Sequence, residues 1–181
     1  MGVRIVMEPA QKALAYDVFR TLRKHRTDEA KFLNAATVVT TKLMSPTNLA
    51  WRVCGITEAA LERFAAMNFK RKSGLKVQRA HLFNRADTTK QLVYMDTEPS
   101  AEEFIEFWEK RDRTVLCLSD QNRKILALKC FKFEEREAPQ FPNLTVGYGY
   151  KDKEEGEFLR MLYASRKSTE TVDVSALAGD D

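Results

Sequence analysis

Arg79 and His81 are the residues of this chain whose types and spacing are best suited to chemistry. Residues 75–83 alternate as a β-strand does, which places both side chains on one face, between apolar residues at its two ends. A histidine titrates near neutral pH and can accept or donate a proton. An arginine two residues away on the same face can hold a phosphate and stabilise developing negative charge. The pair therefore indicates phosphate contact, with nuclease-like cleavage of a phosphodiester as the reaction it would support.

The segment around this pair is strongly basic, with seven Lys or Arg and one Asp between Lys70 and Lys90. Residues 1–90 carry a net charge of +10, and residues 91–181 carry −6. A basic half favours polyanions as partners, but the two halves could equally neutralise each other by packing together. If the partner is a nucleic acid, the candidates for contacting its backbone are Lys70, Arg71, Lys72, Lys76 and Arg85.

Asp112 is the third candidate for a catalytic site. It precedes a strand expected over residues 114–118 and could approach the strand of His81, where it would orient the imidazole or bind a divalent ion. No metal-ligand motif is present, so we predict no cofactor, although a divalent metal is compatible with this site.

The competing interpretation of these three residues is structural. His81 would be a satisfied core histidine, Arg79 would pair with an acid of the C-terminal half, and Asp112 would cap a helix. Burying Arg79 and His81 without partners would cost several kcal/mol, so in both interpretations they must be paired or line a cleft.

Helices are predicted in five parts of the chain around these residues. Apolar residues at helical spacing, together with capping residues, predict helices over 9–25, from Thr27 or Asp28 to about 42, over 58–68, from Ser100 onwards and over 154–166. The β-branched residues 38–41 leave a strand as an alternative to the second helix. Asp87 is expected to cap a turn or short helix, and Gly55 to break the apolar segment that starts at Trp51.

The strands are expected mainly in the second half. Residues 114–118 and 125–133 read as two strands joined by the polar segment 119–124, which predicts a β-hairpin. The almost continuous apolar run of 114–118 indicates a central strand that is buried on both faces. A further strand is expected over 144–150.

This order of elements predicts a single α+β domain over residues 1–166. Helices fill its N-terminal third, and a mostly antiparallel sheet of four or five strands with flanking helices follows. Residues 167–181 are small, polar and acidic, which predicts a disordered tail.

Composition bounds the class of protein. Hydrophobic residues make up 44% of the chain and charged residues 31%, as in ordinary globular proteins and unlike disordered ones. The three cysteines have no metal-like or CxxC spacing, which favours reduced thiols and a cytoplasmic protein. No run approaches the ~18 apolar residues of a membrane span, so no membrane association is expected.

Three functions are compatible with these observations. The first is a protein that binds DNA or RNA by contacting phosphates with its basic half. This protein would also have nuclease-like chemistry at Arg79 and His81. The second is a protein-interaction or regulatory module whose opposed basic and acidic faces dock a partner or build a homo-oligomer. The third is a small-molecule enzyme with a pocket over the same strand.

Overall fold

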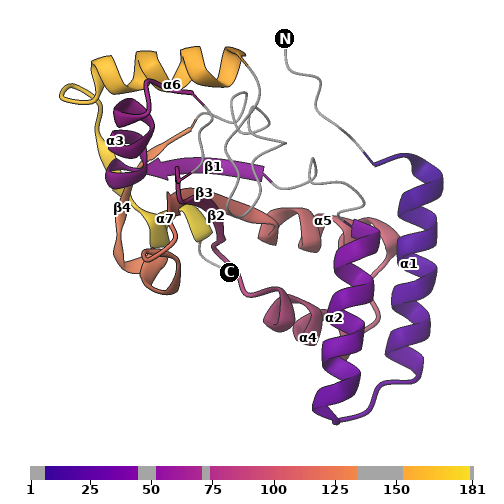
Figure 1. Ribbon diagram of the computed structural model, residues 1–181. Helices are drawn as coiled ribbons and strands as arrows, with labels where there is room; N and C mark the ends of the chain where they lie inside the picture. The colour runs from indigo at the N-terminus through magenta and orange to yellow at the C-terminus, as the bar shows by residue number, and fades with distance from the viewer. Residues whose placement is uncertain (1–6, 45–51, 71–73, 134–152, 180–181) are drawn as a thin grey trace.

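A five-stranded mixed sheet with the order β2-β3-β1-β4-β5 organises the residues that the computed structural model describes, which are 7–44, 52–70, 74–133 and 153–179 (Figure 1). β1 pairs in parallel with β3, and the three other pairings are antiparallel. The α+β class and the mostly antiparallel sheet with flanking helices are therefore confirmed. The strands are β1 (Arg52–Thr57), β2 (Val77–His81), β3 (Arg113–Leu118), β4 (Lys129–Lys132) and β5 (Thr171–Asp173).

β3 is the second strand of the sheet and lies between β2 and β1. Residues 114–117 are fully buried, as the apolar run predicted. The predicted β-hairpin is wrong, because β1 lies between β3 and β4. Its expected second strand divides into a 3₁₀ helix, η1 (Asn122–Ala127), and the shorter β4. Because β1 lies between β3 and β4, its residues Val53 and Ile56 are completely buried. If β3 and β4 paired directly as a hairpin, β1 could not occupy this position in the sheet.

Gly55 lies inside β1, so the prediction that it breaks the segment is wrong. A Cβ atom at this position would lie 2.9 Å from the Phe131 carbonyl oxygen and 3.0 Å from the Cys130 sulfur. The missing side chain lets β4 approach β1, and the register with β3 shifts between Val53 and Gly55 as in a β-bulge.

Each face of the sheet has its own apolar cover. On one face α3 (Glu58–Ala66) and α6 (Lys153–Ser165) enclose a core that includes Phe64, Leu116 and Leu159. Both helices were predicted, and the Thr57 hydroxyl caps α3 by accepting a hydrogen bond from the Ala60 N–H at 3.3 Å.

The other face is covered by η1 and α7 (Val174–Ala178), with Ile125, Val174 and Leu177 buried against it. The prediction of a disordered tail over 167–181 is therefore wrong for residues 171–178, which form β5 and α7. Val174 and Leu177 are the two large apolar residues of α7, and their other neighbours in the helix are small. They nevertheless complete this face of the core.

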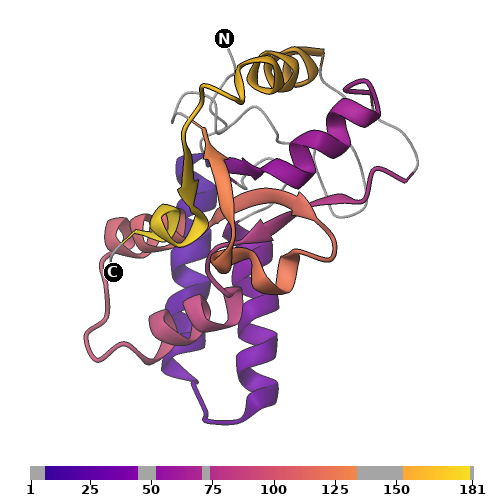
Figure 2. The ribbon, with the colours of Figure 1, turned by 90° about the vertical axis from the view of Figure 1, so that its left-hand side faces the viewer.

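A group of four helices lies beside the sheet (Figure 2). It contains α1 (Pro9–Lys24), α2 (Ala30–Met44), α4 (Arg85–Tyr94) and α5 (Ala101–Arg111). Phe19 of α1 stacks on Phe104 of α5 with their ring centroids 4.5 Å apart. Residues 38–41 are helical, so the strand alternative for them is wrong, and the capping box of Ser100 with Glu103 starts α5 as predicted.

α4 is longer than the turn or short helix expected, and Asn84 rather than Asp87 caps its N-terminus. Its C-terminal carbonyls are held by Arg23, a buried residue of α1. The Arg23 guanidinium donates hydrogen bonds to the carbonyls of Leu92 (3.2 Å), Val93 (3.3 Å) and Asp96 (3.1 Å). This arginine therefore joins α1 to α4 and complements the α4 dipole.

The strand expected over 144–150 lies outside the described residues. Among the helices that the structure describes, none combines the length and hydrophobicity that crossing a bilayer would need.

Candidate functional site

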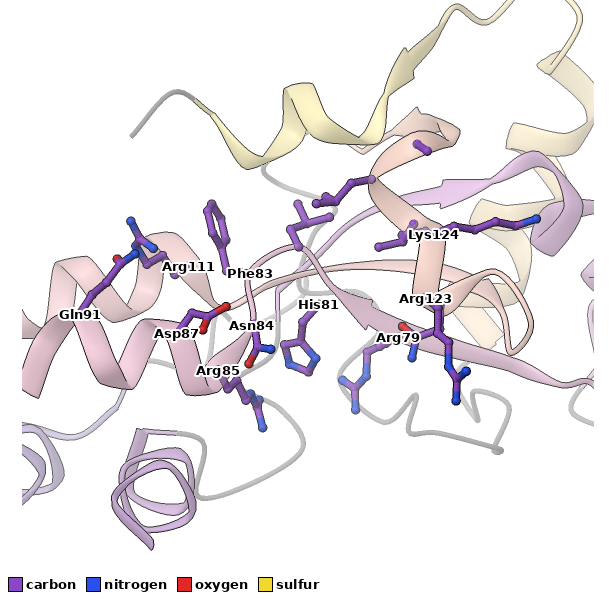
Figure 3. A pocket seen from close by; sticks show the side chains of 15 residues that line it. Arg79, His81, Phe83, Asn84, Arg85, Asp87, Gln91, Arg111, Arg123 and Lys124 are labelled. Atoms are coloured by element: carbon purple, nitrogen blue, oxygen red, sulfur yellow. The ribbon is translucent and has the colours of Figure 1, made fainter. Parts of the chain in front are cut away.

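β2 positions Arg79 and His81. It is an edge strand that pairs antiparallel with β3, with Arg79 opposite Leu116 and His81 opposite Thr114. Because alternate residues of a strand share a face, the two side chains extend to the same side, as Figure 3 shows. Arg79 is 2% exposed, whereas the His81 side chain is 22% exposed.

Two helix ends bring Arg85 and Asp112 to the same place. Arg85 is the first residue of α4, four positions after His81, and Asp112 is the C-cap of α5, just before β3. The Arg85 Nη2 atom lies 3.3 Å from Asp112 Oδ1, and the Asp112 side chain is 6% exposed. The approach of Asp112 to the strand of His81, which we expected, is therefore present.

His81 lies in a net positive environment. Its Nε2 atom is 3.8 Å from Asp112 Oδ1, which is too long for a hydrogen bond, and that oxygen already accepts one from Arg85. Burial, followed by the charges of Arg85 and Arg79, lowers the pKa of His81 to about 3. The nearby carboxylate therefore does not make His81 a cation, and the imidazole is neutral at pH 7.

Arg79 is surrounded by charges of both signs. Burial and the neighbouring Arg85 lower its pKa to about 10, against the opposing effect of Asp112 and of Glu155 on α6. Arg79 therefore stays charged at neutral pH. The two acids lie in the C-terminal half, so the structural interpretation of Arg79 has support alongside the functional one.

A cavity of about 900 Å³ runs along β2 and is lined by residues from β2, α4, α5 and η1. Its walls carry five cationic side chains and one carboxylate, Asp87. Arg79, Arg85 and Arg123 extend to one side of it together with His81 (Figure 3). Apolar side chains form another part of the wall. The five cationic residues that line the cavity are Arg79, Arg85, Arg111, Arg123 and Lys124.

Of the residues predicted to contact a nucleic-acid backbone, the structure brings Arg85 to this cavity. Lys70 and Lys76 are exposed but do not line it. Arg71 and Lys72 lie outside the described residues.

Sequence reasoning missed Arg111, Arg123 and Lys124. Arg111 was given no role beyond its place in the expected helix, and the other two were assigned to the loop of the expected hairpin. All three belong to the half of the chain with net negative charge, which concealed them. The available signal was the basic dipeptide Arg123-Lys124 within the polar segment 119–124.

Across the described ranges, no three or more His, Cys, Asp or Glu residues are grouped so that they could hold a metal ion. Asp112, the candidate ligand, is engaged with Arg85. The compatibility of this site with a divalent metal thus stays a prediction.

Comparisons with protein-family models, with curated proteins and with solved structures yield no match to this chain.

Proposed function

We propose that this protein binds nucleic acid through the cavity along β2. The observation that carries the proposal is the net positive charge of the cavity wall. Five cationic side chains from four elements line the cavity, together with one carboxylate. Like charges brought together at a surface raise the local potential and attract polyanions. A phosphate backbone supplies repeated negative charges that such a wall can neutralise, with release of counterions.

Within this proposal, Arg79 has a fixed position and the cations of η1 are adaptable. Arg79 is buried and stays charged, so its guanidinium is preorganised to hold a phosphate. Arg123 and Lys124 are exposed and can follow the backbone. The cysteines at positions 54, 117 and 130, all among the described residues, form no disulfide, which suits the cytoplasmic location that we propose.

The test measures how affinity depends on salt. A fluorescent 20-nucleotide strand and its duplex are titrated with protein over a range of salt concentrations, and log K is plotted against log salt. Lys124→Glu should weaken binding and make the slope shallower by about 1, because one phosphate contact is lost. Lys31→Glu is the matched control, because Lys31 is an exposed lysine of α2 outside the cavity, and its slope should equal that of the wild type.

Two results would refute the proposal. One is an absence of binding to every nucleic acid at the lowest salt. The other is an equal effect of Lys124→Glu and Lys31→Glu, which would mean that net charge and not the cavity attracts the polyanion.

Nuclease-like chemistry at Arg79, His81 and Asp112 is an extension of this proposal. A general base works best with a pKa near the operating pH, and that of His81 is about 3. A bound phosphate would offset the charges of Arg79 and Arg85 and so raise this pKa. His81→Ala should abolish cleavage and leave binding nearly unchanged if the histidine is catalytic. Persistence of both would make it structural.

A small-molecule enzyme is the second candidate, which the presence of a cavity beside apolar side chains favours. A mononucleotide that binds as tightly as a 20-nucleotide strand, with little dependence on salt, would support it over nucleic-acid binding.

A further inference from the structure

A phenylalanine and an arginine lie at one end of the same cavity. Phe83 lies two residues after the end of β2 and is half-buried, and Arg111 is the last residue of α5. Both line the cavity, and in Figure 3 they lie on the other side of it from His81, Arg79 and Arg85. The cavity thus has one side that carries His81, Arg79 and Arg85 and another side that carries an aromatic ring.

The Arg111 guanidinium is fixed by two rings. Its Cζ atom lies 5.0 Å from the centroid of Phe83 and 4.3 Å from that of Phe107. These are cation–π distances, and the contacts restrict the rotamers of a long side chain before any ligand arrives. The guanidinium lies over one face of the Phe83 ring and supports it, and this half-buried ring lines the cavity, where another planar group can stack on it.

We propose that Phe83 and Arg111 form a stacking platform for an unpaired base, so that the ligand of this cavity is single-stranded nucleic acid. The inference rests on the proposed function and specifies its substrate class. Single strands are bound by a basic groove that follows the phosphates together with aromatic side chains that stack on the bases. In a duplex the base faces are stacked on one another, so Phe83 would have nothing to contact.

The neighbouring polar residues fit the same ligand. Asn84 is exposed at the N-cap of α4, and Gln91 lies about two turns further along that helix. Both line the cavity, and Figure 3 shows Gln91 beside Arg111 and Asn84 beside His81. The Gln91 amide can donate to and accept from the edge of a base, and the Asn84 amide nitrogen can donate while its oxygen accepts from the Ala86 N–H.

The experiment compares four probes at equal charge and low salt: oligothymidylate, oligouridylate, a DNA duplex and inorganic polyphosphate. The wild type should bind one or both single strands at least tenfold more tightly than the duplex and polyphosphate. Phe83→Leu keeps the apolar packing but removes the ring, and it should weaken single-strand binding by about tenfold, the loss of one base stack. Its affinity for polyphosphate should not change, and Phe83→Tyr should restore single-strand binding.

The fluorescence of a 2-aminopurine base in the single strand reports stacking directly. It would not change on binding if Phe83 had only a structural role. This fluorescence should be quenched on binding to the wild type and to Phe83→Tyr, but not on binding to Phe83→Leu.

Duplex binding as tight as single-strand binding, or an unchanged single-strand affinity of Phe83→Leu, would overturn the inference while the proposed function stands. An absence of binding to all three nucleic acids would overturn both.

Discussion

The partly buried, neutral imidazole of His81 should make the fold sensitive to mild acid. Its pKa is 6.5 when unperturbed and about 3 in the folded protein, so protonation favours the unfolded chain. The stability that depends on a neutral His81 is fully present above pH 6.5 and is lost as the pH falls towards 3.

The size of the loss follows from the two pKa values. At pH 7 only about a quarter of the unfolded imidazoles carry a proton, so the cost is well below about 1 kcal/mol. At pH 5 almost all of them do, whereas the folded imidazole stays neutral, and the cost rises to about 2 kcal/mol. His81 alone should therefore lower the free energy of unfolding by about 2 kcal/mol between pH 7 and pH 5.

Urea denaturation at both pH values, followed by tryptophan fluorescence, measures this loss. His81→Gln cannot titrate, so its free energy of unfolding should fall by about 2 kcal/mol less than that of the wild type. His25→Gln is the control: it replaces the other histidine of the chain, at the exposed C-cap of α1, and should behave as the wild type. If the wild type and His81→Gln lose stability equally, the imidazole is not held neutral and the electrostatic description of the site is refuted.

Two further predictions concern the fold that holds the site. Gly55→Ala should lower the free energy of unfolding by about 1–3 kcal/mol, because its methyl group would lie 2.9 Å from the Phe131 carbonyl oxygen; an unchanged urea midpoint would contradict this. Arg23→Ala removes three hydrogen bonds to the end of α4 and should cost about 2–3 kcal/mol, with Arg23→Lys recovering less than half, as thermal and urea denaturation would show.

Helices with local start signals could be predicted from the sequence. The capping box at Ser100 and the Thr57 cap act within four residues of the chain, so a local reading finds them. The pairing of β1 with β3 and β4 could not be found in this way. It depends on how distant strands compete for positions in the sheet, and the short polar segment between β3 and β4 favoured a hairpin on local grounds alone.

In the candidate site, too, the features set by neighbouring residues could be predicted and those set by distant contacts could not. Strand alternation placed Arg79 and His81 on one face, and Asp112 was expected near them. The contribution of Arg123 was missed because net charge was counted by half-chain, whereas the fold brings η1 against β2. The structure also places Asp112 and Glu155 near Arg79. From the sequence, a structural role and a ligand-binding role of Arg79 were treated as alternatives, but the position of this arginine is compatible with both.

The parallel pairing of β1 with β3 affects how this protein folds during its synthesis. Gly55 pairs with Val115, about 60 residues later in the chain. At about 5–20 residues per second, a ribosome needs about 3–12 s to add the partner of β1. During this interval Val53 and Ile56 have no strand to cover them, and the opposite face waits longer, until Val174 and Leu177 emerge. The nascent chain therefore exposes these apolar residues until their partners are synthesised, and the protein should refold more slowly than helical proteins of similar length.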